Sequence, residues 1–135
     1  MEVIAMKKII LILIIISLLT GCILANSDNN PVVFKDAKLE KVIREKIDKP
    51  KGKILKKDIQ KITELDLSEL QISSLQGVEQ FSSLKKLNLS ECGLKNISSL
   101  KKLKELERLD LVDNKIEDIS SLKKLKKLKI LYLYH

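Results

Sequence analysis

Apolar and polar residues recur along the chain with a period of 22 residues. The segments that begin at residues 62, 84 and 106 align position by position, and a fourth begins at 128 with "LKILYLYH". A period of this length is typical of solenoids, in which one repeat cannot bury its apolar face alone but stacked repeats can. The pattern therefore predicts a stack of coils with a core that runs along the stack.

Each unit holds two apolar sets. The first alternates with polar residues, as in a short half-buried strand, and consists of Leu65/Leu67, Leu87/Leu89, Leu109/Leu111 and Leu131/Leu133. The second is spaced by three residues, which suits a 3₁₀-like or tightly turned return. It consists of Ile72, Leu75, Val78 and Phe81, then Leu94, Ile97, Leu100 and Leu103, then Ile116, Ile119, Leu122 and Leu125. The alternative is an amphipathic α-helical bundle, but "LDLS" and "LNLS" alternate at period 2 and not at 3.6.

The pattern L-x-x-L-x-L-x-x-N/C-x-L resembles the leucine-rich repeat, and "I-x-x-I-S-S-L" resembles the internalin type of Gram-positive surfaces. The resemblance implies an α/β solenoid with parallel strands on the concave side and 3₁₀ or irregular returns on the convex side. In the family, an Asn after the strand bonds to the backbone of the adjacent coil. Asn114 matches that position, Cys92 is an accepted weaker substitute, and Leu70 departs from the pattern.

The stretch before the repeats predicts a small helical cap. From Asp36, a good N-cap residue, apolar residues follow helical spacing, and "DKPKG" with Pro50 and Gly52 ends the helix. These apolar residues are Leu39, Val42, Ile43 and Ile47. A second helical turn is expected at 56–61, with Ile59 and Ile62 turned inward. This stretch resembles the amino-terminal cap of internalin-like proteins. We therefore expect the cap at 32–61 and the repeats, three full and one truncated, at 62–135.

The amino-terminal residues have the layout of an export signal. Lys7 and Lys8 precede an apolar run over residues 9–19, which is shorter than the about 20 residues of a membrane-spanning helix. Translation could start at Met1 or at Met6, because the segment from Met6 is a complete signal by itself. We therefore expect residues 1–21 to be a signal peptide.

The sequence "LTGC" at residues 19–22 resembles the lipobox of bacterial lipoproteins. The resemblance implies that the Cys22 thiol takes a diacylglyceryl group and that cleavage occurs before it, which would anchor the chain to the outer face of the bacterial cell membrane. Residues 22–31 would then be the lipidated cysteine and a tether of roughly 30 Å. The alternatives are an ordinary secretory signal with a chance cysteine, or an uncleaved anchor.

The amino-acid composition limits which side chains can form the core. The chain has no Trp, two Tyr and two Phe, so the core must be aliphatic. Loss of residues 1–21 removes Lys7, Lys8 and Glu2, which leaves 24 basic and 17 acidic residues and a formal charge of +7. With Cys22 acylated, Cys92 has no partner for a disulfide, and we expect it to be a small, buried, inert thiol.

The outward residues of the strands are the candidate protein-binding positions, because solenoids commonly hold another protein on their concave surface. They are Glu64, Asp66 and Ser68 in the first unit, Lys86, Asn88 and Ser90 in the second, Arg108, Asp110 and Val112 in the third, and Ile130, Tyr132 and Tyr134 in the fourth. The alternative is that these are solvated strand positions. The surface is barely the about 800 Å² per partner of a standard interface.

Lysines recur on the predicted returns. They are Lys101, Lys102, Lys104, Lys123, Lys124, Lys126, Lys127 and Lys129. Stripes of this kind could face anionic lipid headgroups or wall polymers, and the alternative is plain solvation. Nucleic acid is not expected as a partner, because an exported protein rarely meets it and no aromatic platform accompanies the lysines.

No motif for catalysis, a cofactor or a metal is apparent, since the one histidine is the last residue and no Cys or His cluster has ligand spacing. The leading hypothesis is therefore a membrane-anchored extracellular leucine-rich-repeat lipoprotein that binds an unidentified protein and is not an enzyme. One alternative is a remnant of a longer surface protein with no binding of its own. Another is a basic protein that contacts anionic membrane or wall polymers. The fourth strand, with Ile130, Tyr132 and Tyr134, could also self-associate through its free edge.

Overall fold

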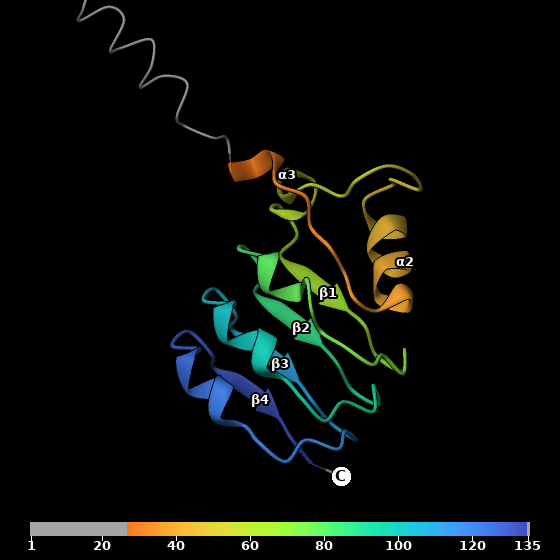
Figure 1. Cartoon of the computed structure of the whole chain (residues 1–135). Helices are drawn as coiled ribbons and strands as arrows, with labels where there is room; N and C mark the ends of the chain where they lie inside the picture. The colour runs from red at the N-terminus through yellow and green to blue at the C-terminus, as the bar shows by residue number, and fades with distance from the viewer. Residues whose placement is uncertain (1–26, 135) are drawn as a thin grey trace, which may run out of the picture.

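The computed structural model describes residues 27–134, so the predicted signal peptide, the lipidation site Cys22 and His135 lie outside the described residues. Figure 1 shows similar coils stacked one on the next, with a helical cap over the first. Among residues 27–134, no helix is long and apolar enough to cross a membrane.

Each coil contributes one short strand to a parallel sheet. The strands are β1 (Glu64–Asp66), β2 (Lys86–Asn88), β3 (Arg108–Asp110) and β4 (Ile130–Tyr132), and they pair in sequence order. Leu65 aligns with Leu87, Leu87 with Leu109, and Leu109 with Leu131, so the register equals the sequence period. The predicted α/β solenoid with parallel strands is confirmed.

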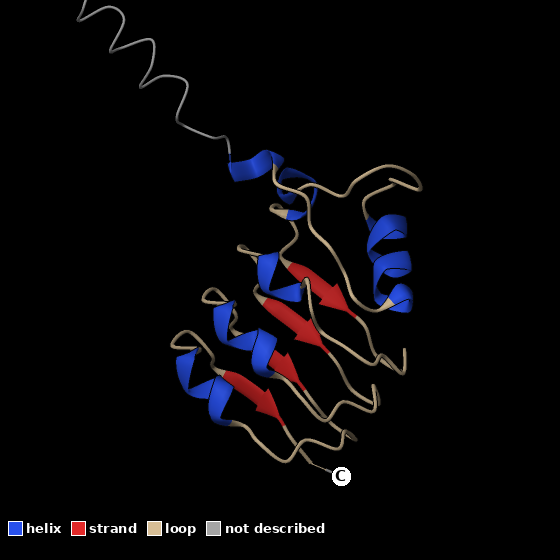
Figure 2. Cartoon of the chain, viewed as in Figure 1, coloured by secondary structure: helices blue, strands red, loops and turns tan. Residues whose placement is uncertain are grey.

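The returns are 3₁₀ helices on the other side of the coils from the sheet (Figure 2). They are η2 (Val78–Gln80), η3 (Ser98–Lys102) and η4 (Ser120–Lys124). The residues spaced by three in the first two coils all point inward and are buried. In a 3₁₀ helix side chains three apart lie above one another, so this spacing supplies one apolar edge per return.

Burial of the apolar residues falls off in the third and fourth coils. Ile97 is 1% exposed, whereas Ile119, at the same position one coil later, is 47% exposed. Leu131 and Leu133 are each 40% exposed, although the matching strand leucines of the second coil are buried. The expected burial of both apolar sets is therefore found in the first two coils and is incomplete in the third and fourth, because no further coil of the described chain stacks on them.

The cap consists of η1 (Ser27–Asn29), α2 (Ala37–Lys46) and α3 (Lys56–Ile59). Asp36 is the N-cap of α2, and its Oδ1 accepts bonds from the backbone N–H groups of Lys38 and Leu39. The helix ends at Lys46, before the predicted stop at Pro50 and Gly52. The reason is a left-handed residue, Asp48, at φ 50°, after which the Lys49 N–H bonds to the Arg44 carbonyl, as in a Schellman motif.

The end of the stretch predicted as a tether packs on the cap. Pro31 forms an antiparallel bridge with Leu55, and the Val32 N–H donates to the Ile54 carbonyl at 2.8 Å. The Asn30 carbonyl accepts from the Lys56 N–H at 2.9 Å, at the start of α3. Asn30 and Pro31, at the end of the expected tether, are thus bonded to the cap through their backbone.

The cap is joined to the first return by one buried carboxylate. Asp36 Oδ2 accepts from the Ser73 N–H (2.6 Å) and the Ser73 hydroxyl (2.8 Å), while Oδ1 caps α2. Phe34 adds an aromatic contact with Phe81, at 6.1 Å between ring centroids. These contacts fix α2 beside the first strand, which places one of its lysines next to the sheet.

Candidate functional site: the concave face of the sheet

The predicted binding residues lie in rows on the face of the sheet turned away from the returns, which we call the concave face. The strand pairing places Glu64, Lys86, Arg108 and Ile130 in the first row, and Asp66, Asn88, Asp110 and Tyr132 in the second. The third row, just past the strands, is Ser68, Ser90, Val112 and Tyr134. All twelve are exposed or partly exposed. The structure therefore places the twelve residues together on one exposed face, and their binding role stays a prediction.

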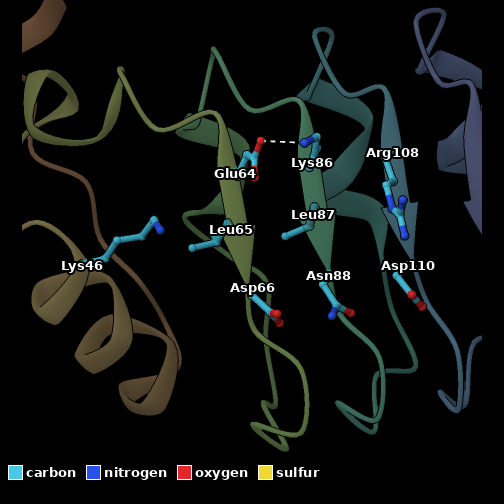
Figure 3. Close-up of a pocket in the computed structure, with 9 residues that line it drawn as sticks. All are labelled: Lys46, Glu64, Leu65, Asp66, Lys86, Leu87, Asn88, Arg108 and Asp110. Atoms are coloured by element: carbon cyan, nitrogen blue, oxygen red, sulfur yellow. Dashed lines mark ion pairs between the residues drawn. The ribbon is translucent and has the colours of Figure 1, made fainter.

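A shallow groove of about 310 Å³ lies over the first three strands. Figure 3 shows Lys46 reaching from α2 toward β1, with Asp66, Asn88 and Asp110 following one another at one end of the strands. The groove thus has a helical wall on the side of the cap and a floor made by the sheet. Lys46 was not among the predicted site residues, because helical spacing in the cap says nothing of how α2 docks beside the sheet.

In the first row, Glu64 and Lys86 near the cap form an ion pair, and Arg108 further along contacts an aromatic ring. Lys86 Nζ lies 2.7 Å from Glu64 Oε1, and this hydrogen bond holds the pKa of Glu64 below its ordinary value. Both side chains are more than half exposed, so the pair adds little to stability. The Arg108 guanidinium carbon lies 5.1 Å from the centroid of the Tyr132 ring. A partner would therefore meet an Arg already held on an aromatic ring.

The second row is held in place by the chain itself. Asp66 Oδ1 accepts from the Ser68 N–H (3.0 Å) and hydroxyl (2.8 Å), and Asn88 Oδ1 accepts from the same two groups of Ser90. The Ser68 N–H is the main cause of a lowered pKa at Asp66, against the opposing effect of burial. These side chains lose little freedom on binding, because their orientation is already fixed.

The third row changes from hydroxyls to apolar groups along the stack. Ser68 and Ser90 are replaced by Val112 and by Tyr134, which is 64% exposed, and Ile130 beside them is 41% exposed. Tyr and Arg are enriched among residues that dominate binding energy at interfaces. The third and fourth coils therefore carry the part of the concave face that is richest in residue types typical of protein interfaces.

The residues at the Asn position of the repeat lie behind this face and are structural. Asn114 Nδ2 donates to the Leu89 carbonyl at 2.7 Å, and its Oδ1 accepts from the Leu94 N–H at 2.9 Å, so it bonds to the preceding coil as the resemblance implied. Cys92 Sγ donates to the Leu67 carbonyl at 2.9 Å. Burial raises the pKa of the Cys92 thiol to about 11, so it stays protonated and unreactive.

The chemistry of the described residues offers no metal centre. Across residues 27–134, no group of three or more His, Cys, Asp or Glu side chains is placed to hold a metal ion. The carboxylates of the concave face are spaced along the strands, and they accept from Lys86, from Ser68 or from the Val112 N–H of the same surface. The arrangement is therefore suited to contact with a surface rather than to coordination of an ion.

Comparison with known proteins agrees with this architecture. The family described as Leucine Rich repeats (2 copies) matches residues 104–135. The crystal structure of an internalin (inlF) from Listeria monocytogenes is 33% identical with a TM-score of 0.71, over 82% of this chain and 33% of that one. The chain thus spans about a third of the length of that internalin. No curated protein matches the sequence.

Two further solved structures are similar. The structure titled CBM51-2 and INT domains from Clostridium perfringens ZmpB is 27% identical with a TM-score of 0.52, over 62% of this chain and 19% of that one. The internalin C2 (inlC2) of Listeria monocytogenes is 21% identical with a TM-score of 0.56, over 81% of this chain and 61% of that one, which supports the fold alone. The described chain is therefore a leucine-rich-repeat solenoid with a helical cap at its amino-terminal end, similar in fold to the internalins.

Proposed function

We propose that this chain is a lipid-anchored extracellular protein whose concave face binds another protein. The observation that carries the proposal is the surface of the third and fourth coils, where Arg108 lies on Tyr132 beside the exposed Tyr134 and Ile130. Internalin-type solenoids are interaction scaffolds, and no cluster of reactive groups in the described residues suggests catalysis. The partner would therefore be held by surface complementarity, with Arg108 and the tyrosines at its centre.

The anchor is the second half of this proposal. It is supported by the lysines, apolar run and "LTGC" sequence that end at Cys22. Two or three acyl chains would hold the chain durably, since one chain of about fourteen carbons binds a bilayer only marginally. The tether would then be shorter than residues 22–31, because Asn30 already bonds to Lys56 at the start of α3. The solenoid would then stand close to the outer face of the membrane.

The protein-binding role is tested by site-specific photocrosslinking on cells that express the full chain. A crosslinking amino acid at Tyr134 should give a discrete adduct with another protein, and one at Ser98, an exposed residue of η3 on the opposite side, should not. Arg108→Glu should abolish the Tyr134 adduct, and Lys95→Glu, a charge reversal on a turn outside the concave face, should leave it. Equal adducts from both positions, or an adduct insensitive to Arg108→Glu, would refute the proposal.

The anchor is tested separately by metabolic labelling with an alkyne fatty acid. The wild-type chain should incorporate the label and fractionate with the membrane, and Cys22→Ser should lose both properties. Cys92→Ser is the matched control, because that buried thiol should take no label. Label retained by Cys22→Ser would contradict lipidation at Cys22 and leave the concave-face proposal intact.

A further inference from the structure

Six lysines occupy matching positions on two neighbouring coils. Lys101 and Lys123, Lys102 and Lys124, and Lys104 and Lys126 are each one repeat apart, and all six are exposed. We call this surface the lysine face. It lies on the side of the returns, away from the concave face, and is formed by η3, η4 and the residues just after them.

The positive charge of the lysine face is largely uncompensated. Within residues 27–134, none of its lysines belongs to an ion pair. The nearby carboxylates Glu105 and Glu107 are paired instead with Lys127 (2.6 Å) and Lys129 (2.7 Å). Asp118 lies close enough to this face for Lys123 to contribute to its lowered pKa, although the main cause is its bonds from Ser120. Six ammonium groups without an ion pair leave a positive potential on this side of the described chain.

The face begins abruptly at the second coil. The first coil carries Glu79, Gln80 and Ser82 at the same repeat positions. A general need for solubility would be met equally well by lysines on the first coil, so the change in charge along the stack indicates a localised surface. The fold itself uses only one of the six side chains: Lys104 Nζ donates to the Lys101 carbonyl (2.7 Å) and the Lys124 carbonyl (3.3 Å), which ties the two coils together.

The geometry favours a linear ligand. Neighbouring coils of a parallel sheet are about 4.8 Å apart, so the paired lysines form rows that run along the stack. Fixed rows of ammonium groups attract a chain that carries closely spaced negative charges, because each contact releases counterions from the polymer. Lysine binds phosphate as a compact point charge and needs no special fork geometry.

Two other polyanionic partners fit this surface less well. A membrane-binding surface normally inserts apolar side chains between its cations, but the lysines here are flanked by Ser98, Ser99, Ser120 and Ser121. Ile119, although exposed, stands at the inward position that Ile97 fills in the coil before it, so it faces along the stack. Single-stranded nucleic acid is bound with aromatic stacking platforms, and the aromatic residues of the described chain are buried or on the concave face.

We propose that the lysine face binds a linear phosphate-bearing polymer without bases, that is, one other than a nucleic acid, which lies along the solenoid independently of any protein held on the concave face. The test uses the full chain held in phosphatidylcholine vesicles and fluorescent long-chain polyphosphate as the probe. The test variant is Lys101→Gln/Lys102→Gln/Lys123→Gln/Lys124→Gln. The matched control, Lys35→Gln/Lys41→Gln/Lys51→Gln/Lys53→Gln, removes the same charge from exposed lysines of the cap region.

The test variant should bind polyphosphate at least about tenfold more weakly than the wild type, and the slope of log affinity against log salt should fall by about 3, close to one per lost contact. The control variant should lose less than about twofold, because it changes only the long-range field, which salt screens. Equal losses in the two variants would overturn the proposal, since they would indicate attraction by net charge alone.

A measurement on the unaltered chain guards against misfolded variants. Polyphosphate should protect Lys101, Lys102, Lys123 and Lys124 from acetylation, as read by mass spectrometry, and should leave Lys35 and Lys41 reactive. Protection of the same four lysines by phosphatidylglycerol vesicles without polymer would overturn the proposal in favour of a lipid surface. Single-stranded DNA that displaces polyphosphate at equal phosphate concentration would overturn it in favour of nucleic acid.

Discussion

At the scale of single residues, positions 92 and 114 show how one site in the repeat is filled by two chemistries. Asn114 is 3% exposed and bonds to the coil before it through both its amide nitrogen and its amide oxygen. Cys92, 1% exposed, makes only a weak S–H bond to the Leu67 carbonyl. The interface between the first and second coils therefore has a weaker polar link than the next one.

We predict that Cys92→Asn stabilises the protein. The new amide would reach the Leu67 carbonyl as Asn114 reaches that of Leu89, and its oxygen would face the Ile72 N–H as Asn114 faces that of Leu94. One added buried bond contributes about 1 kcal/mol, which chemical denaturation would detect as a higher midpoint. Asn114→Cys, the reverse change, should lower the midpoint by at least as much, and a gain from it would contradict this account.

Asp36 makes the attachment of the cap dependent on pH. Burial acts to raise the pKa of this carboxyl, but bonds from Ser73, Leu39 and Lys38 outweigh it and hold the pKa below its ordinary value. A lowered pKa in the folded state means that stability is present above the unfolded pKa of about 3.9 and is lost as pH falls through the folded value.

Asp36→Asn should therefore destabilise the chain by about 1–3 kcal/mol near neutral pH, because an amide cannot accept from both Ser73 and the N-terminal N–H groups of α2. The difference in melting temperature from the wild type should shrink as pH falls through the lowered pKa of Asp36 in the folded state. Thermal unfolding of both proteins over a series of pH values measures this difference in melting temperature. A difference that persists in acid would show that the charge of Asp36 is not the cause.

At the scale of elements, the sequence predicted the strands and the returns of the repeat best, because the 22-residue period fixes which of their residues point inward. The alternation that begins at Leu65 and Leu67 occurs in four units and predicts a strand in each, and the spacing by three from Ile72 occurs in three units and predicts a tight return in each. The end of α2 was placed too far along the chain, because no simple rule expects Asp48 in the left-handed conformation. The approach of Lys46 to the sheet depends on how the cap docks, which is a tertiary property that no local pattern carries.

The docking of the cap depends on Gly77, which sits at φ 103° before η2. A Cβ there would lie 2.5 Å from Phe34 Cδ1 and 2.8 Å from the Val33 carbonyl oxygen. Gly77→Ala should therefore destabilise the chain by about 1–3 kcal/mol through overpacking, in addition to the cost of its positive φ.

Gly52→Ala is the matched control for that variant. Gly52 also has a positive φ, 81°, but a Cβ there meets nothing within 4 Å. Gly52→Ala should lower the free energy of unfolding only by the cost of placing a residue with a Cβ at a positive φ, about 1 kcal/mol. Equal shifts in the midpoints of urea unfolding for the two alanine variants would mean that the contact between Gly77 and Phe34 is not tight in solution.

At the scale of the whole molecule, the core is a line of similar layers whose stability depends on the neighbours of each layer. The equivalent strand leucines Leu87 and Leu109 are 2% and 0% exposed, whereas Leu131 is 40% exposed. The layers in the middle of the stack have a coil on both sides, and β4 has one on a single side among the described residues. Position in the stack, and not residue type, should then set the energetic weight of each leucine.

The same substitution at two layers tests this. Leu109→Ala should cost about 3–5 kcal/mol, because it empties a fully buried site between two coils, and Leu131→Ala should cost about 1 kcal/mol, because much of that side chain already contacts water. Urea unfolding of the full chain, followed by circular dichroism, measures both values. Equal costs would show that the open face at β4 is covered in solution, and dependence of the Leu131→Ala effect on protein concentration would then identify a second copy of the chain as the cover.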